Sequence, residues 1–88
     1  MGLQMLKKTR MYHSDKEQER AAIRGRVAAN LRQARQFNRM TVEDLSIEIG
    51  VAWKTVMRWE HRETDITLFD ASRCAKALKI PLEQLLSD

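Results

Sequence analysis

Residues 41–60, TVEDLSIEIGVAWKTVMRWE, carry the strongest structural signal in this chain. Thr41 is a good N-cap, and the apolar spacing after it predicts a helix of about two turns. Gly50 allows the sharp reversal of the backbone that ends this helix. A second short helix follows over about residues 52–60, with Trp59 on its buried side. Two short helices joined by a tight turn containing glycine indicate a helix-turn-helix unit.

Upstream of this unit, the pattern predicts one longer helix. Ser14 and Glu17 have the spacing of a capping box, which places the start of the helix at Ser14. The helix is expected to end near residues 37–38, with Asn38 in a left-handed cap. Apolar residues recur at three- and four-residue spacing on the face that we expect to be buried, namely Ile23, Val27, Leu31 and Ala34.

Downstream, the sequence predicts two further helices after a polar loop. Thr67 is expected to cap a fourth helix that ends at Leu78, and Pro81 suits the first turn of a short fifth helix. The inward residues expected on the fourth helix are Leu68, Ala71, Ala75 and Leu78. The short fifth helix is expected to carry Leu82, Leu85 and Leu86. The fold class is therefore all-α.

Composition limits the class of protein. Eighty-eight residues suit one domain, and the single Cys74, expected to be buried, excludes an internal disulfide and fits a reducing cytoplasm. No apolar run approaches the ~20 residues needed to cross a bilayer, so a soluble cytoplasmic protein is expected. Residues 1–40 carry a net charge of +7 and residues 41–88 a net charge of −3. This asymmetry suggests a polyanionic partner, although the charges could equally solvate helix faces.

The residues from about 24 to 86 resemble the lambda repressor/Cro family. The match includes a seven-residue loop between Glu60 and Leu68 and holds without insertion. The matching residues are Arg35, TVEDL at 41–45, IGV at 49–51, Thr55, Val56, RWE at 58–60, Leu68, AKAL at 75–78 and LEQLL at 82–86. The resemblance implies a five-helix DNA-binding domain, and usually a dimer on DNA. The capping box at Ser14 places this domain over residues 14–88, with a first helix that starts some ten residues earlier than the resemblance needs.

The resemblance also implies roles for individual residues. Arg35 and Glu60 are expected to form an ion pair that anchors the recognition helix. The residues expected to reach base edges are Trp53, Lys54, Met57 and Arg58. Those expected to contact the DNA backbone are Thr41, Thr55 and Arg62. The chain departs from the family pattern at Val42, often polar, at Trp53, often Gln, Ser or Arg, and at Arg62, often Gly, so individual contacts there are open.

Residues 1–13 are expected to form a flexible basic tail. Lys7, Lys8 and Arg10 could contact the DNA backbone or the minor groove. Alternatively, apolar residues of the tail could pack against a partner subunit, or the tail could have no role. The apolar residues concerned are Leu3, Met5 and Leu6. Arg20 and Arg24 could add a further DNA contact.

Three classes of function follow, with unequal support. The leading hypothesis is a sequence-specific transcriptional regulator of phage or bacterial type, a Cro-like repressor that binds an operator in double-stranded DNA as a homodimer. The candidate dimer surface is formed by Leu82, Leu85 and Leu86. The alternative is an antitoxin-type interaction module that also binds its own operator.

An enzyme is not expected, because no nucleophile–base pair, metal-ligand spacing or glycine-rich phosphate loop occurs. His13 and His61 have no partner at metal-ligand spacing. We therefore expect no cofactor, no metal, no small-molecule ligand and no membrane association. The expected location is the cytoplasm, with the nucleoid, or the host cytoplasm for a phage protein.

Overall fold

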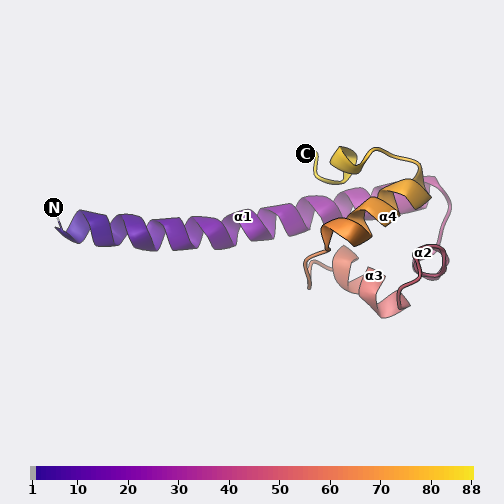
Figure 1. Cartoon of the computed structure of the whole chain (residues 1–88), viewed down its shortest axis with the longest axis horizontal. Helices are drawn as coiled ribbons and strands as arrows, with labels where there is room; N and C mark the ends of the chain where they lie inside the picture. Colours follow the sequence, from indigo (N-terminus) through magenta and orange to yellow (C-terminus); the bar gives the residue numbers. More distant parts are fainter. Residues whose placement is uncertain (1) are drawn as a thin grey trace.

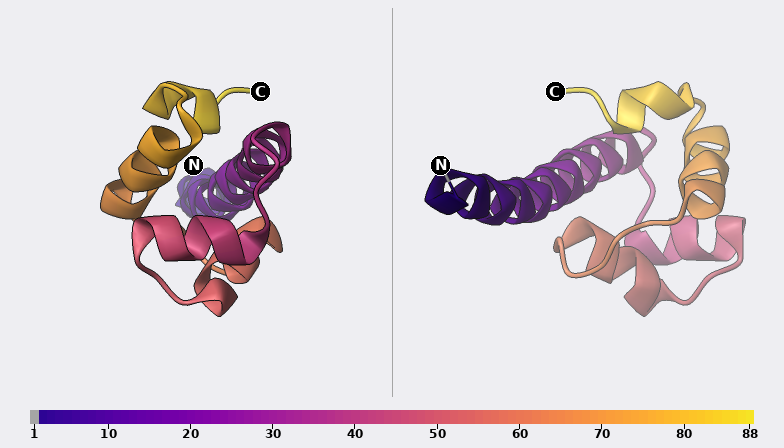
Figure 2. Two further views of the ribbon diagram at one scale, coloured as in Figure 1. Left: turned by 90° about the vertical axis from the view of Figure 1, so that its right-hand side faces the viewer. Right: turned by 60° about the vertical axis from the view of Figure 1, so that its left-hand side comes forward.

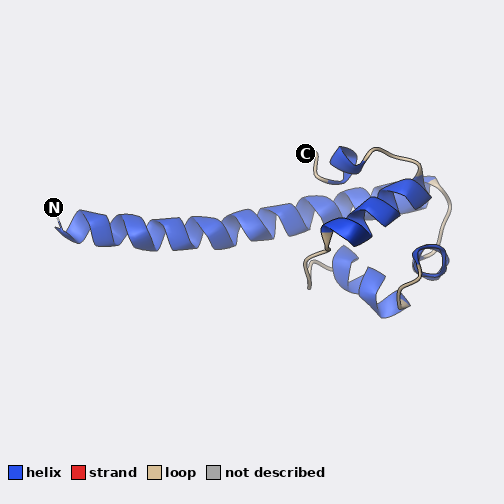
Figure 3. Ribbon diagram, viewed as in Figure 1, coloured by secondary structure: helices blue, strands red, loops and turns tan. Residues whose placement is uncertain are grey.

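The computed structural model describes the backbone of residues 2–88 and the side chains of residues 15–88. No strand occurs among these residues, so the all-helical class is confirmed (Figures 1 and 3). The elements in chain order are α1 (Gly2–Phe37), α2 (Val42–Ile49), α3 (Trp53–Glu60), α4 (Leu68–Leu78) and η1 (Leu82–Leu85). The fifth element is a single 3-10 turn preceded by Pro81, and not the short α-helix that was expected. None of the described helices is long and apolar enough to cross a membrane.

The first helix is longer than the sequence indicated. It begins at Gly2, so Ser14 and Glu17 lie inside α1, and the prediction of a helix start at Ser14 is wrong. The N-terminal part of α1 extends away from the body that the other elements form (Figure 1). The greatest extent of the molecule is consequently 56 Å, against 23 and 19 Å in the other two directions.

The core lies where the C-terminal half of α1 meets the other elements (Figure 2). Contacts join α1 to α3, α4 and η1, and join α2 to α3 and α4. The side chains with under 2 % exposure are Leu31, Leu45, Ile49, Val56, Cys74, Leu78 and Leu85. Two residues expected to face inward do not, since Ile23 is 45 % exposed and Leu68 is 74 % exposed. Both lie at the margin of the body, where no described element covers them.

Left-handed backbone conformations mark the ends of all four α-helices. The helix α2 uses Gly50, whose φ is 75°. The other three use charged residues with φ of 56°, 62° and 60°, namely Arg39, Arg62 and Lys79. Asn38 was expected in this conformation, but its neighbour Arg39 adopts it. The side-chain amide of Asn38 donates to the carbonyl oxygen of Leu78 at 3.1 Å. Asn38 therefore ties the end of α1 to the end of α4.

Candidate nucleic-acid interface

Local chemistry fixes both ends of α2. Thr41 Oγ1 accepts a hydrogen bond from the backbone N–H of Asp44 at 3.0 Å, and Asp44 Oδ2 accepts from the Thr41 N–H at 2.9 Å. At the other end, the N–H groups of Gly50 and Val51 donate to the carbonyl oxygen of Ser46 at 2.9 and 3.0 Å. The turn between α2 and α3 is therefore short and rigidly specified.

The helix α3 has one buried face and one face open to solvent. Val56 has no exposed surface and Trp59 is 4 % exposed, which confirms Trp59 as a core residue. Four residues at helical spacing lie on the other side, namely Trp53, Lys54, Met57 and Arg58. We call these four residues the outer stripe. Lys54 and Arg58 are exposed, Trp53 is 47 % exposed and Met57 is half-buried.

Trp53 and Lys54 also interact with each other. The Nζ atom of Lys54 lies 5.9 Å from the centroid of the Trp53 ring, within the range of a cation–π contact. Both side chains lie at the N-terminal end of α3 and are exposed. The outer stripe therefore presents a positive charge, an aromatic surface and a guanidinium on one side of a short helix.

An ion pair ties the C-terminal end of α3 to α1. Arg35 donates from Nε to Glu60 Oε2 at 2.7 Å and from Nη2 to Glu60 Oε1 at 3.0 Å. Its third bond runs from Nη1 to the carbonyl oxygen of Met40 at 2.7 Å. Glu60 is only 4 % exposed. The hydrogen bond to Glu60 raises the pKa of Arg35 above its ordinary value, against the opposing effect of burial. The expected Arg35–Glu60 pair is thus present, with bidentate geometry.

A second arginine, Arg32, also contacts Glu60, and the sequence analysis missed it. Arg32 Nη2 donates to the main-chain carbonyl oxygen of Glu60 at 2.9 Å, and its Nε lies 3.6 Å from Glu60 Oε1. Arg32 stands three residues before Arg35, and this spacing on one face of α1 was the available signal. Asn30 was also missed, and its side-chain amide donates to two carbonyl oxygens of the C-terminal segment at 3.0 and 2.7 Å.

Comparison with known proteins identifies the family. The model of the Cro/C1-type HTH DNA-binding domain matches residues 30–88. This chain belongs to that family. The fold is similar to the crystal structure of a hypothetical transcription factor, NHTF, from Neisseria, with a TM-score of 0.72 and 28 % sequence identity over 74 % of this chain and 75 % of that one. No curated protein matches the chain.

The Cro/C1-type match confirms the resemblance inferred from the residues, and the family is one of DNA-binding regulators and not a class of enzymes. The remaining candidates are the residues expected to contact the DNA backbone. Thr41 is exposed at the start of α2, and Thr55 is half-buried on α3. Arg62 is exposed beyond α3, with its guanidinium carbon 3.8 Å from the position that a Cβ would take at Gly25. The side chains of Lys7, Lys8 and Arg10 lie outside the described residues.

Two arginines of α1 are engaged within the chain. Arg24 Nε donates to Asp65 Oδ1, and Arg20 Nε lies 3.9 Å from Asp65 Oδ2. These contacts join α1 to the segment between α3 and α4. The same two arginines were named as residues that could add a DNA contact, and here they pair with an acidic residue that follows the recognition helix.

The three leucines expected at a dimer surface differ in exposure. Leu85 has no exposed surface and belongs to the core, so the expectation that it contacts a partner is corrected. Leu82 is partly buried, and Leu86 is 50 % exposed. Only part of the expected surface is therefore open to another molecule.

Cys74 and the described acidic residues were also considered as a reactive thiol and as metal ligands. Cys74 is fully buried, and this burial raises the pKa of its thiol to about 12. Among the residues whose side chains are described, no group of three or more potential ligands could hold a metal ion. Cys74 therefore acts as a small core residue.

Proposed function

We propose that this chain is a sequence-specific regulator of transcription, a Cro-like repressor, that places α3 in the major groove of double-stranded DNA. The outer stripe is the observation that carries the proposal. Three of its four side chains are exposed and Met57 is half-buried, while the opposite face of α3 is packed in the core and the end of α3 is held by two arginines. A helix held in this way can enter the groove without rearrangement of the protein.

The chemistry of the outer stripe suggests what it recognises. The guanidinium of Arg58 can donate two hydrogen bonds to O6 and N7 of a guanine, which discriminates by ~1–3 kcal/mol. Trp53 and Met57 offer apolar surface suited to the methyl group of thymine. Lys54 can reach a base or a phosphate. Thr41, Thr55 and Arg62 are proposed to contact the DNA backbone.

The proposed regulator acts as a homodimer. A single α3 reads only a few base pairs, whereas two copies related by a two-fold axis read two half-sites about one helical turn apart. The operator is consequently expected to be palindromic. Footprinting on the DNA that flanks the gene tests this expectation directly, and a protected site without two-fold symmetry would contradict the dimeric arrangement.

A series at Arg58 tests the base contact. Arg58→Ala is expected to lower operator affinity by ~1–3 kcal/mol while nonspecific binding changes little. Arg58→Lys keeps the charge but loses the planar fork, so it should lose nearly as much operator preference. Lys76→Ala, at an exposed position on α4, serves as the control and should retain operator preference. Equal losses on operator and random DNA would show that Arg58 contacts only phosphate.

The dependence on salt tests the electrostatic part of the proposal. Each phosphate neutralised by the protein should contribute about −0.9 to the slope of log affinity against log salt concentration. A steep slope is expected for the wild-type chain on operator DNA. A flat dependence would contradict insertion of this basic helix into the groove.

A further inference from the structure

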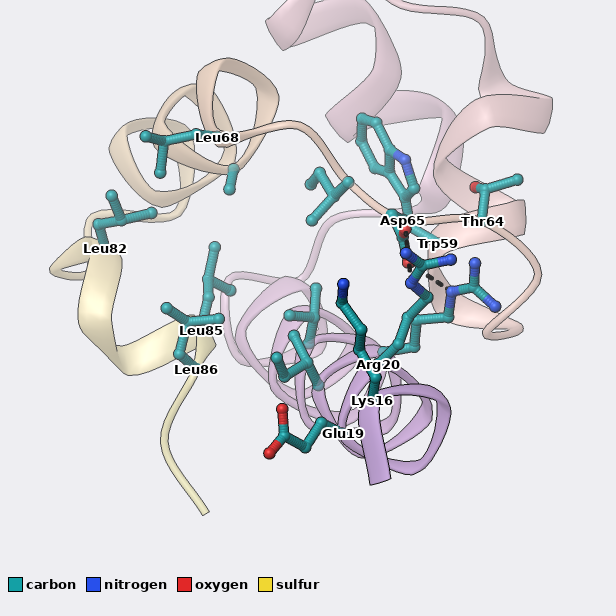
Figure 4. A pocket seen from close by; sticks show the side chains of 15 residues that line it. Lys16, Glu19, Arg20, Trp59, Thr64, Asp65, Leu68, Leu82, Leu85 and Leu86 are labelled. Carbon is teal, nitrogen blue, oxygen red and sulfur yellow. Dashed lines mark hydrogen bonds and ion pairs between the residues drawn. The ribbon is translucent and has the colours of Figure 1, made fainter. Parts of the chain in front are cut away.

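An apolar groove of about 400 Å³ lies between α1, η1 and the segment that leads into α4 (Figure 4). Binding sites for small molecules in proteins have volumes of about 300–1,000 Å³ and predominantly apolar linings. The buried side chains of Val27, Trp59 and Leu85 line the interior of this groove. Trp59 belongs to the face of α3 opposite the outer stripe, so the proposed DNA contact does not use the groove. Three further apolar side chains of the lining are 45, 74 and 50 % exposed, namely Ile23, Leu68 and Leu86.

Five charged residues also line the groove, and their pairing leaves one cation directed into it. Asp65 is already paired, because Arg24 Nε donates to its Oδ1 and Arg20 Nε lies 3.9 Å from its Oδ2. Lys16 and Glu19 form no ion pair with any described side chain. Figure 4 shows the ammonium end of Lys16 directed into the groove and the carboxylate of Glu19 directed away from it. Among the described side chains, the groove therefore combines an apolar interior with one unpaired positive charge.

We propose that this groove binds a small amphipathic carboxylate, with its carboxylate on the Lys16 ammonium and its alkyl chain along Val27 and Leu85. A carboxylate complements the unpaired ammonium, and a single negative charge suffices because Asp65 already offsets the neighbouring arginines. An alkyl chain complements the lining, because its apolar residues are aliphatic apart from Trp59. Binding covers apolar surface that the chain otherwise exposes to water.

The size of the groove favours a free small molecule over a segment of another protein. An α-helix with its side chains is about 10 Å wide and rises about 5.4 Å per turn. One helical turn therefore occupies roughly 400 Å³ and would fill the groove by itself. An extended alkyl chain is much thinner, so the same volume accommodates a whole molecule of medium length. The expectation of no small-molecule ligand rested on local motifs, whereas the residues of this groove lie far apart in the chain.

Two probes with the same alkyl chain and opposite charges test the proposal on the full chain without DNA. Decanoate carries one carboxylate and decyltrimethylammonium carries one cation, and both are used below the concentrations at which they form micelles. Isothermal titration calorimetry measures each dissociation constant, and the fluorescence of Trp59 in a Trp53→Phe background reports contact with the groove. The wild-type chain should bind decanoate saturably and at least about fivefold more tightly than the cationic probe, because an exposed ion pair contributes about this much.

Charge reversal at Lys16 separates the ion pair from apolar binding. Lys16→Glu should reverse the preference, so that the cationic probe binds at least about fivefold more tightly than decanoate. Lys76→Glu makes the same change in net charge at an exposed position of α4 outside the lining, and should keep the wild-type preference. Ile23→Gln removes an apolar side chain from the edge of the groove and should weaken both probes by a similar factor, about threefold or more. Helicity by circular dichroism checks that each variant is folded.

The outcomes are distinct. Saturable binding of decanoate, with a preference that follows the charge at position 16, would support the site. Absence of saturable binding, an unchanged Trp59 signal, or equal binding of both probes by the wild-type chain would overturn the inference. So would a preference that Lys16→Glu leaves intact or that Lys76→Glu also reverses. None of these results involves DNA, so the proposed function stands or fails separately, on the footprint and the Arg58 series.

Discussion

Removal of the charge at Arg35 is expected to weaken the packing of the recognition helix on α1. Arg35→Met deletes both hydrogen bonds to Glu60 and the bond to the Met40 carbonyl oxygen. The Glu60 carboxylate, 4 % exposed, then keeps only the half-exposed Arg32, with its Nε at 3.6 Å, as a nearby cation. Loss of one partner from a buried pair costs about 3–5 kcal/mol. Because Arg32 remains, we expect the low end, about 3 kcal/mol.

The complementary change should cost less. Glu60→Gln keeps one acceptor oxygen, and Arg35, with its side chain 13 % exposed, keeps its bond to Met40. We expect this variant to lose about 1–2 kcal/mol. In the double variant no buried charge lacks its original partner, so its loss should be smaller than the sum of the two single losses by about 1–2 kcal/mol. For a domain of this size, 3 kcal/mol lowers the Tm by roughly 12–24 °C.

Urea unfolding followed by the fluorescence of buried Trp59 measures these losses, in a Trp53→Phe background that removes the exposed indole. Arg26→Met is the matched control, because Arg26 pairs at 3.4 Å with Asp88, whose side chain is 93 % exposed. This control should change the free energy of unfolding by less than about 0.5 kcal/mol. A loss below about 1 kcal/mol for Arg35→Met, or additive losses in the double variant, would show that the pair does not hold α3.

Three further changes have clear expected outcomes. Gly25→Ala should raise stability in urea by about 0.5–1 kcal/mol, because alanine favours the helix more than glycine does. The added Cβ fits, since it would meet the Arg62 guanidinium at an ordinary 3.8 Å, and destabilisation would mean a tighter contact. Lys79→Gly should add about 1 kcal/mol by relieving a φ of 60°, whereas Lys76→Gly, inside α4, should lose a similar amount. Cys74 should resist alkylation at pH 8 until urea unfolds the chain, because burial raises the pKa of its thiol to about 12. The same shift should make the free energy of unfolding fall from about pH 9 upwards, since the thiol ionises at a lower pH in the unfolded chain than in the folded one. Cys74→Ala should reduce this fall. Alkylation of the native chain at the rate of the unfolded chain would contradict the burial of Cys74.

The helix-turn-helix unit could be predicted from sequence because its signals are local. The Thr41 cap, the Gly50 turn and the spacing of Val56 and Trp59 each act within a few residues. The side of α3 that faces solvent followed from the same spacing. The Arg35–Glu60 pair spans 25 residues and was reached only through the family resemblance.

The features that the sequence did not indicate depend on distant parts of the chain. Arg32 meets the Glu60 carbonyl across 28 residues, and Asn30 meets the Leu85 carbonyl across 55. A periodic apolar face shows which residues share a side but not what covers them. For this reason Ile23 and Leu68 were expected in the core, and Leu85 at a dimer surface, when the structure places each of them the other way.

The charge asymmetry of the chain also has a structural role, in addition to the polyanionic partner that the sequence suggested. The N-terminal half carries most of the positive charge, but five of its arginines form ion pairs with acidic residues of the C-terminal half. These arginines are Arg20, Arg24, Arg26, Arg32 and Arg35. Lys54 and Arg58, in contrast, form no ion pair with any described side chain. The arginines of α1 thus hold the elements together, and the cations left free for a polyanion on the outer stripe are the two on α3.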